Sequence, residues 1–426
     1  MKTSKSIKVK FFTDISPELP GILLEWDGKK ILVDPGRNEQ QLQASQLLPQ
    51  FDIPNLDAIV LTHYHGDHVN LVDEILKSEE FRGRIICHRA TADIVQTYYD
   101  DIDQQFKERF VRLNYCENFN LYGDDSLTLF NAGHVLGSSI VYFKFQDKII
   151  AITGDLGADC LPIVQKPTTE FPTGSIDLLI MDAKQAEKLR DVDDSLGDVI
   201  YKKLRDCFLF DDGNVLIYAP LVQIPMLLYC LNYIFNNEKY SDIHNKIAKV
   251  YLDRQQKLLK LLKIFDDYKF LFDTHEVEHV TQDKHPFSFK KLVKLLPTNY
   301  KLRRSIIITP NRNEFVRFFK VFKQSEKNDV LLLNTNIHFA LKADIGLIDE
   351  QCNIQIKRLP FLHYHPDQSE LIDWYKTIRA TVGVNRVVFY HYYRNSKIEK
   401  MKRIIKKEVG GNIYLAHRLN HSSITI

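Results

Sequence analysis

Three histidines and one aspartate lie within six residues of this chain, in Leu61-Thr-His-Tyr-His-Gly-Asp-His68. The chain has only 15 histidines in 426 residues, so chance does not explain this density. Imidazole and carboxylate groups are the ligands that Zn²⁺ and similar divalent ions take in proteins. An apolar run, Leu56–Thr62, precedes the cluster and predicts a strand that delivers it on a loop. The pattern therefore predicts a metal site at His63, His65, Asp67 and His68.

Other acids and imidazoles stand at the ends of predicted strands. Alone, each is weak evidence, because an aspartate that follows a strand often only shapes a turn. As a series in a chain that also carries the His63–His68 cluster, they predict one shared site. They are Asp34 after Ile31-Leu-Val, His134 in Ala132-Gly-His-Val-Leu-Gly-Ser138, Asp155 in Ile152-Thr-Gly-Asp, Asp182 in Leu178-Leu-Ile-Met-Asp, His365 in Leu362-His-Tyr-His-Pro-Asp-Gln368, and His391 after Val387-Val-Phe-Tyr.

The H-x-H-x-D-H pattern after an apolar strand resembles the metal motif of the metallo-β-lactamase superfamily. The resemblance implies that Asp34 supports the ligand loop, that His134 is the third histidine of a first metal site, and that Asp155 bridges two metals. It also implies an αββα sandwich of the α/β class.

The motif Gly-His-Val-Leu-Gly-Ser resembles, more specifically, that of the β-CASP nucleases of that superfamily. Those proteins insert a βαβ-type domain into the sandwich. Three later motifs follow in the family's order at Asp182, His365 and His391. His363 competes with His365, but Pro366-Asp367-Gln368 follows His365 as the motif requires. The resemblance implies that His63, His65 and His134 hold one ion, that Asp67, His68 and His391 hold a second, and that Asp155 bridges them. Asp67, His365 and Asp182 are its implied catalytic residues.

The activity that this resemblance implies is hydrolysis of phosphodiester bonds, most simply of RNA, by a hydroxide that two zinc ions activate. Manganese is the alternative metal. A histidine at position 391 favours RNA over DNA, because the DNA-processing members of the family tend to have an apolar residue there. His365, oriented by Asp182, would protonate the departing 3′-oxygen. A DNA nuclease, a small-ester hydrolase of the same superfamily and a non-catalytic scaffold subunit of an RNA-processing complex remain alternatives.

Three segments depart from the family's pattern, at residues 182–185, 221–225 and 309–314. All three fall where the family's inserted domain touches substrate, so the resemblance leaves the mode of substrate binding open. The predicted substrate contacts are Ser138, beside the His134 loop, and basic residues of the segment Lys284–Arg304, which has seven Lys/Arg and no acid. Those basic residues are Lys290, Lys291, Lys294, Arg303 and Arg304. A second basic segment, Lys397–Glu408, has six Lys/Arg against two Glu; a solvated helix face explains such a segment equally well.

The elements that must position these residues change character along the chain. Short strands with turn residues dominate before Asp182, whereas strands and helices alternate after it, which is typical of a parallel sheet. We therefore expect a metallo-β-lactamase domain at 1–195, an inserted β-CASP domain at 196–350 and a return to the first domain at 351–426. The uncharged stretch Val215–Phe235 is long enough for a membrane span, but Pro220 and Pro225 favour a strand, a turn and a helix.

Composition restricts the class of protein further. Charged residues make up 26% and hydrophobic residues 44%, as in globular proteins, and the formal net charge is only +2. That balance argues against a uniformly basic coat, though not against a local basic groove. Six cysteines without a C-x-x-C pair, and an N-terminus without an apolar run, predict reduced thiols, no signal peptide and a cytoplasmic protein. The oligomeric state stays open, with a homodimer as one alternative.

Overall fold

The computed structural model describes two compact units, each of which is considered by itself. It describes residues 6–16, 18–37, 43–98, 107–159, 164–172, 174–186, 196–210, 214–244, 246–247, 249–252, 256–272, 292–293, 304–323, 329–333, 355–359, 365–392 and 396–426. The first unit contains Met1–Asp159, Val164–Asp191 and Tyr364–Ile426. The second contains Cys160–Ile163 and Val192–His363, so it interrupts the first along the chain.

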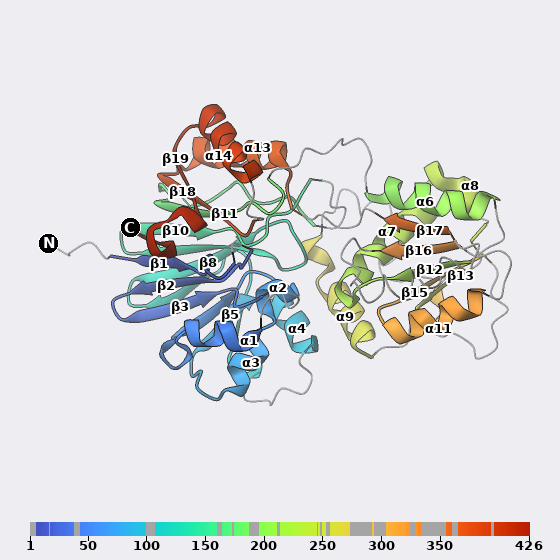
Figure 1. The fold of residues 1–426 in the computed structure, drawn as a ribbon, viewed down its shortest axis with the longest axis horizontal. Helices are drawn as coiled ribbons and strands as arrows, with labels where there is room; N and C mark the ends of the chain where they lie inside the picture. The colour runs from blue at the N-terminus through green and yellow to red at the C-terminus, as the bar shows by residue number, and fades with distance from the viewer. Residues whose placement is uncertain are drawn as a thin grey trace. The chain divides into compact units, whose positions relative to one another are not determined.

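The first unit contains two seven-stranded sheets (Figure 1). One sheet has the order β20-β1-β2-β3-β4-β5-β6 and is parallel from β3 to β6. The apolar runs predicted as strands form its central members. Its strands are β1 (Lys8–Phe11), β2 (Ile22–Trp26), β3 (Lys29–Val33), β4 (Ala58–Leu61), β5 (Arg84–His88), β6 (Phe110–Leu113) and β20 (Ser423–Thr425).

The other sheet has the order β19-β18-β11-β10-β9-β8-β7. It is antiparallel from β7 to β10 and parallel from β10 through β11 and β18 to β19. The chain therefore returns to this sheet after the second unit to complete it. Its strands are β7 (Asn118–Tyr122), β8 (Asp125–Asn131), β9 (Ser139–Phe145), β10 (Lys148–Ile152), β11 (Leu178–Asp182), β18 (Arg386–Tyr390) and β19 (Asn412–Leu415).

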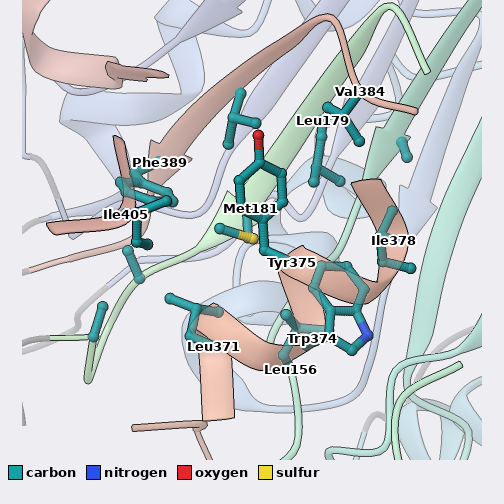
Figure 2. Close-up of a cluster of buried hydrophobic side chains, with 14 of the residues drawn as sticks. Leu156, Leu179, Met181, Leu371, Trp374, Tyr375, Ile378, Val384, Phe389 and Ile405 are labelled. Atoms are coloured by element: carbon teal, nitrogen blue, oxygen red, sulfur yellow. The ribbon is translucent and has the colours of Figure 1, made fainter. Parts of the chain in front are cut away.

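Helices cover the outer faces of the two sheets. A core of apolar side chains from both sheets, among them Val33, Phe143 and Ile152, joins their inner faces. On the outer face of the second sheet, α13 (Gln368–Thr381) and α14 (Ser396–Glu408) pack through Tyr375 and Ile405 (Figure 2). Figure 1 shows α1 (Ala44–Leu47), α2 (Gly66–Val69), α3 (Val72–Lys77) and α4 (Arg89–Tyr98) on the side of the first sheet. The predicted αββα sandwich is thus confirmed.

The second unit is built on a six-stranded parallel sheet, in the order β14-β13-β15-β12-β16-β17. Its strand Ser305–Thr309 is fully buried, as expected where helices cover a parallel sheet. The strands are β12 (Val215–Tyr218), β13 (Lys249–Leu252), β14 (Leu292–Val293), β15 (Ser305–Thr309), β16 (Asp329–Leu333) and β17 (Gln355–Leu359). The helices are α6 (Leu196–Phe210), α7 (Ile224–Asn236), α8 (Ser241–His244), α9 (Gln256–Asp267) and α11 (Arg312–Lys323).

The predicted boundary at residue 351 lies too early. Strand β17 pairs with β16 in the sheet of the second unit, and the first unit resumes at Tyr364. From sequence alone, the short strand β17 could belong to either domain. Only its pairing with β16 assigns it to the second unit. The stretch Val215–Phe235 divides into β12 and α7, as expected from its prolines. Among the described residues, no helix is long and apolar enough to cross a membrane.

Candidate metal centre

The predicted site residues come together in the first unit, mostly where strands end. Asp34 follows β3, His63 lies two residues beyond β4, and His391 follows β18. Asp155 lies three residues beyond β10, and Asp182 is the last residue of β11. In the first sheet β3 runs parallel to β4, and in the second sheet β10 and β18 run parallel to β11. The carboxyl ends of these strands therefore meet at one edge of each sheet. The topology therefore gathers residues that are far apart in sequence.

One group of facing ligand atoms contains His63, His65, His134 and Asp155. Each offers a ring nitrogen or carboxylate oxygen, and these atoms lie within 4.8 Å of one another. His134 Nε2 lies 3.2 Å from Nδ1 of His65, although the two residues come from loops 69 positions apart. The predicted first set of ligands is thus assembled.

A second group contains Asp67, His68 and His391, whose ligand atoms also lie within 4.8 Å of one another. Asp67 and His68 are neighbours in the one-turn helix α2, which begins directly after His65. His391 Nε2 lies 3.7 Å from Oδ2 of Asp67. The second predicted set is therefore assembled as well.

Asp155 lies at the centre of the site and faces imidazoles of both groups. Its side chain is buried, and five imidazole Nε2 atoms lie 3.1–3.6 Å from its two carboxylate oxygens. The nearest is that of His68, at 3.1 Å from Oδ1. The other four belong to His63, His134, His365 and His391. A carboxylate in this position can contact ions held by either group.

The other ring nitrogen of several histidines is held by a hydrogen bond. His68 Nδ1–H donates to Oδ2 of Asp34 at 2.8 Å, and His391 Nδ1–H donates to the Glu18 carbonyl at 2.7 Å. Thr62 donates its hydroxyl to Asp34 at 2.6 Å, so its oxygen accepts from His63 Nδ1–H at 3.1 Å. These bonds place the proton on Nδ1 and leave Nε2 as the ligand atom, as in metal-binding histidines generally.

Asp34 supports the ligand loop as predicted. It is fully buried, and besides His68 and the Thr62 hydroxyl it accepts a hydrogen bond from the Thr62 backbone N–H at 2.7 Å. Its φ is 50°, and that of His391 is 53°, both in the left-handed region that non-glycine residues rarely adopt. Such conformations persist where the surroundings fix them, and they concentrate at functional sites.

Glycine at position 36 lets two segments of the site approach each other closely. A Cβ atom added to Gly36 would meet the backbone oxygen of Asp67 at 1.9 Å. No side chain fits at that distance, so the loop after β3 requires glycine here to lie against α2.

Burial and the crowded charges shift the pKa values of the site residues. Burial lowers the pKa of His65 and of His391 to about 4. Burial opposes charge on His68 too, but the carboxylates of Asp155 and Asp34 prevail and raise its pKa well above the usual value. Burial also disfavours the Asp155 carboxylate, yet the surrounding imidazoles, with His68 foremost, hold its pKa well below the usual value. His68 and Asp155 therefore each stabilise the charged form of the other.

The donor set fits divalent metal ions. Nε2 of His63, His68 and His391 and Oδ1 of Asp155 are buried, and none of them makes a hydrogen bond to any residue that the structure describes. Buried polar atoms rarely go unpaired in native proteins, and an ion is one explanation where they converge. Imidazoles and carboxylates in this proportion suit Zn²⁺ and related ions.

Asp182 and His365 form the predicted pair. His365 Nδ1–H donates to Oδ2 of Asp182 at 2.6 Å, across 183 residues of sequence. Asp182 is buried and also accepts hydrogen bonds from the backbone N–H groups of Leu156 and Lys184. Nε2 of His365 lies 3.4 Å from Asp155, so this imidazole faces the two ligand groups.

The structure gives Ser138 a role in the loop of His134, and its predicted contact with substrate stays a prediction. This residue is buried, and its hydroxyl oxygen accepts hydrogen bonds from the backbone N–H groups of His134 and Val135. It therefore shapes the loop that carries His134. Of the basic residues predicted to contact substrate, Lys290, Lys291, Lys294 and Arg303 lie outside the described residues, and Arg304 lies in the second unit with φ 50°. In α14, Lys397, Lys400, Arg403, Lys406 and Lys407 are exposed.

Sequence reasoning missed three groups that position the site. Lys184 donates to Oδ2 of Asp67 at 2.8 Å, Thr62 links His63 to Asp34, and the Glu18 carbonyl holds His391. The departure from the family's pattern at residues 182–185 could have drawn attention to Lys184. A backbone carbonyl such as that of Glu18 leaves no signal in a sequence.

The other two departures lie in the second unit. Pro220 precedes a single 3₁₀ turn, Leu221–Gln223, that leads into α7. Asn311 begins α11, and its side chain accepts hydrogen bonds from the backbone N–H groups of Asn313 and Glu314. Both segments have local structural roles, and their effect on substrate binding stays a prediction.

Comparison with known proteins identifies the domain that carries the site. Residues 22–195 match the model of the metallo-beta-lactamase superfamily. This stretch is a metallo-β-lactamase domain. The transcription termination factor FttA of Thermococcus kodakarensis is 22% identical over 457 residues, covering 91% of this chain and 66% of the relative. The inserted parallel-sheet unit is what the β-CASP resemblance implies, and the match to this relative extends over both units.

Other relatives match shorter stretches of the chain. FttA of Pyrococcus horikoshii is 29% identical over 54% of this chain and 39% of its own length. The endoribonuclease YSH1 of Kluyveromyces lactis is 23% identical over 38% of this chain and 24% of its own length. The chain thus spans less than two thirds of each of these relatives. A crystal structure of a protein of unknown function from Enterococcus faecalis has the same fold, with a TM-score of 0.60 over 99% of this chain and 12% identity.

Proposed function

We propose that this protein is a metal-dependent phosphodiesterase that cleaves RNA. The observation that carries the proposal is the position of Asp155 between two assembled ligand groups, with five imidazole nitrogens facing its carboxylate. The superfamily binds divalent metal ions, and we infer that two zinc ions occupy these groups, with manganese as the alternative.

The ligand groups would bring two ions to one carboxylate. His63, His65 and His134 would hold the first ion, Asp67, His68 and His391 would hold the second, and Asp155 would contact both. When bound, two such ions lower the pKa of a water molecule and place positive charge beside the phosphate oxygens. Asp34 and the Glu18 carbonyl hold the Nδ1 protons of His68 and His391, so the Nε2 atoms of both residues face the site. His68, whose pKa is raised, would release its Nε2 proton when an ion binds.

His365 is the proposed general acid. Its Nδ1–H donates to Asp182, so Nε2 faces the site and is placed to give a proton to a departing oxygen. In the proposed step, a water loses one proton to the solvent and its oxygen attacks phosphorus, the bond from phosphorus to the 3′-oxygen breaks, and the Nε2 proton of His365 passes to that oxygen. His365 then regains a proton from the solvent. Asp182 acts through His365 and does not touch the substrate.

RNA is the favoured substrate for two reasons. The chain carries a histidine at position 391, as RNA-cleaving members of the resembled family do. Among its relatives is a protein named as an endoribonuclease, although the chain spans only part of that relative. The exposed lysines and arginines of α14 offer a positive face on the first unit that suits a phosphate backbone.

The test uses 5′-labelled RNA and DNA of one sequence with the full chain, before and after a chelator strips the metal. We expect shortened RNA only when zinc or manganese is present, and the product lengths distinguish internal from terminal cleavage. Asp155→Asn should abolish cleavage, whereas Asp159→Asn, a nearby aspartate with an exposed side chain, should retain it. Full turnover by Asp155→Asn would overturn the proposal.

A second comparison isolates the proposed acid. His365→Asn should slow cleavage by a factor of about 10²–10⁴, the usual contribution of a general acid. His421→Asn is the control, because His421 is exposed and lies outside the site. A substrate whose leaving group needs no proton should be cleaved by His365→Asn at nearly the wild-type rate; an equal loss on both substrates would contradict the role.

The same measurements address the other candidate activities. Faster cleavage of DNA than of RNA would favour a DNA nuclease, and hydrolysis of a small ester alone would favour a small-molecule hydrolase. Metal analysis that finds less than one ion per chain would favour a non-catalytic scaffold subunit. The complete set of ligand residues argues against that last alternative.

A further inference from the structure

A lysine, Lys184, reaches into the candidate metal centre. It lies two residues beyond the end of β11, in the segment Asp182-Ala-Lys-Gln185 that departs from the family's pattern. Its backbone N–H donates to Oδ1 of Asp182 at 2.9 Å, which fixes the turn after the strand. Its side chain is only 24% exposed. A lysine so placed is held by the site and is not a solvated surface residue.

The ammonium group of Lys184 bonds a candidate ligand of the second ion. Its Nζ lies 2.8 Å from Oδ2 of Asp67, and the same oxygen lies 3.7 Å from Nε2 of His391. Asp67 Oδ2 is therefore an oxygen for which an ammonium and a metal ion would compete. A fixed positive charge at this distance also repels any divalent ion that enters the Asp67, His68 and His391 group.

Lys184 acts unequally on the two ligand groups. It makes its direct contact, an ion pair at 2.8 Å, with Asp67 of the second group. Its charge also acts on Asp155 and on His65, but the interaction with Asp67 is the stronger one. The ion pairs of Asp155 in the described part of the chain are all with histidines, which are neutral when they bind metal. The charge of Lys184 therefore falls mainly on the second group, although the ligand types of the two groups are similar.

We propose that Lys184 makes the two metal sites unequal. Its ammonium shares Asp67 with the second ion, so the site of Asp67, His68 and His391 binds a divalent ion more weakly than the site of His63, His65 and His134. The inference rests on the proposed function only in that both groups hold ions. At low metal concentration the protein would carry one ion, and the second would bind as the concentration rises.

The test measures metal binding and not cleavage. Chelator-stripped full-length protein is titrated with Zn²⁺ by calorimetry, and with Co²⁺ by visible absorption, which reports the ligands of each ion. Wild type should bind one ion tightly and a second more weakly. Lys184→Met should bind the second ion on the order of tenfold or more tightly and change the affinity for the first ion by a smaller factor. Lys184→Arg, which keeps the charge, should retain the weak second site.

Two controls make the result specific. Lys166→Met removes another lysine that pairs with an aspartate, Asp159, at 2.9 Å but lies outside the site, and it should leave both affinities unchanged. His391→Asn should remove the weaker binding and keep the tighter one, which assigns the weak site. Lys184→Gln removes the charge while keeping a hydrogen-bond donor, and it replaces Lys184→Met if that variant does not fold.

Three outcomes would overturn the inference. They are equal affinities for both ions in wild type, an unchanged second affinity in both uncharged variants, and the same change in Lys166→Met. The proposed function fails separately, since a protein that binds two unequal ions but cleaves no RNA would refute the ribonuclease and leave the role of Lys184 intact.

Discussion

Replacement of Asp34 by asparagine tests how the residues behind the ligands control the metal site. Asp34 is fully buried and accepts hydrogen bonds from the Thr62 N–H, the Thr62 hydroxyl and His68 Nδ1–H. Asparagine has the same shape and tolerates the left-handed backbone found here. It offers only one acceptor oxygen, however, and its other terminal atom is a donor.

The magnitude follows from counting those three bonds. The remaining oxygen can still accept from the Thr62 N–H, and the Thr62 hydroxyl can rotate to accept from the new amide. The new amide NH₂ then faces His68 Nδ1–H. Both groups are hydrogen-bond donors, so no bond forms between them. Losing the His68 bond to a charged acceptor costs about 1.5–3 kcal/mol of folding free energy, unless the His68 proton moves from Nδ1 to Nε2.

Such a proton shift would protect the fold at the expense of the metal. A proton on Nε2 occupies the lone pair that would bind the second ion. We therefore expect Asp34→Asn to weaken the second site about 10- to 100-fold, the usual effect of removing a partner of a ligating histidine. The first site should change little, because His65 and His134 do not contact Asp34.

The assay combines zinc calorimetry with ¹⁵N chemical shifts of the histidine side chains, which report the protonated nitrogen. The thermal transition that shifts on zinc addition monitors the stability of the metal-binding unit. Asp27→Asn is the matched control, because Asp27 also has a left-handed backbone, at φ 44°, but is exposed. Asp34→Asn that binds the second ion with wild-type affinity, or retains the Nδ1–H form of His68, would refute the reasoning.

Three further outcomes are expected. Gly36→Ala should displace the helix that carries Asp67, since its Cβ would meet a backbone oxygen at 1.9 Å, and should weaken the second site in zinc calorimetry. Chelation should lower the thermal midpoint of wild type and zinc should restore it, because a ligand that binds only the folded state stabilises by about 4 kcal/mol at 1,000 times its Kd. In the metal-free protein, His65 and His391 have pKa values of about 4, lower than in the unfolded chain, so protons bind the unfolded state preferentially. The thermal midpoint should therefore fall as pH drops from about 6.5 toward 4. His68, whose pKa is raised, stabilises the folded state as pH falls toward about 6.5 and adds little change below that pH, so an unchanged midpoint between pH 6.5 and 4 would contradict the reasoning.

The metal ligands could be predicted from sequence because their spacing carries the information. His63 to His68 lie on one loop, and the other ligands follow strands whose apolar runs are visible in the sequence. Parallel strands bring their carboxyl ends to one edge, so strand order is enough to gather Asp155 and His391. The pairing of His365 with Asp182 was likewise predictable from the order of the motifs, and the structure places the two 2.6 Å apart.

What could not be predicted depends on contacts that spacing does not encode. Ser138 adjoins a ligand loop, and from sequence its hydroxyl could equally face substrate or backbone; the structure turns it to the backbone. Lys184 begins a charged run that resembles a surface segment, and only its contact with Asp67, 117 residues earlier, gives it a place in the site. The domain boundary after 350 was missed because a strand's sheet is set by its partners.

The segment after β11 links the two halves of the proposed chemistry. Asp182 holds His365, the proposed acid, and accepts the backbone N–H of Lys184, whose ammonium in turn holds Asp67. Two residues of opposite charge, two positions apart, thus orient one group that would give a proton and one that would hold a metal ion. The ligand histidines fix where the ions would sit, so a β-CASP protein that keeps them can still change its metal requirement and its acid together through this one turn. The departure from the family's pattern at residues 182–185 would therefore act on the proposed metal centre itself, in addition to any effect on the substrate face.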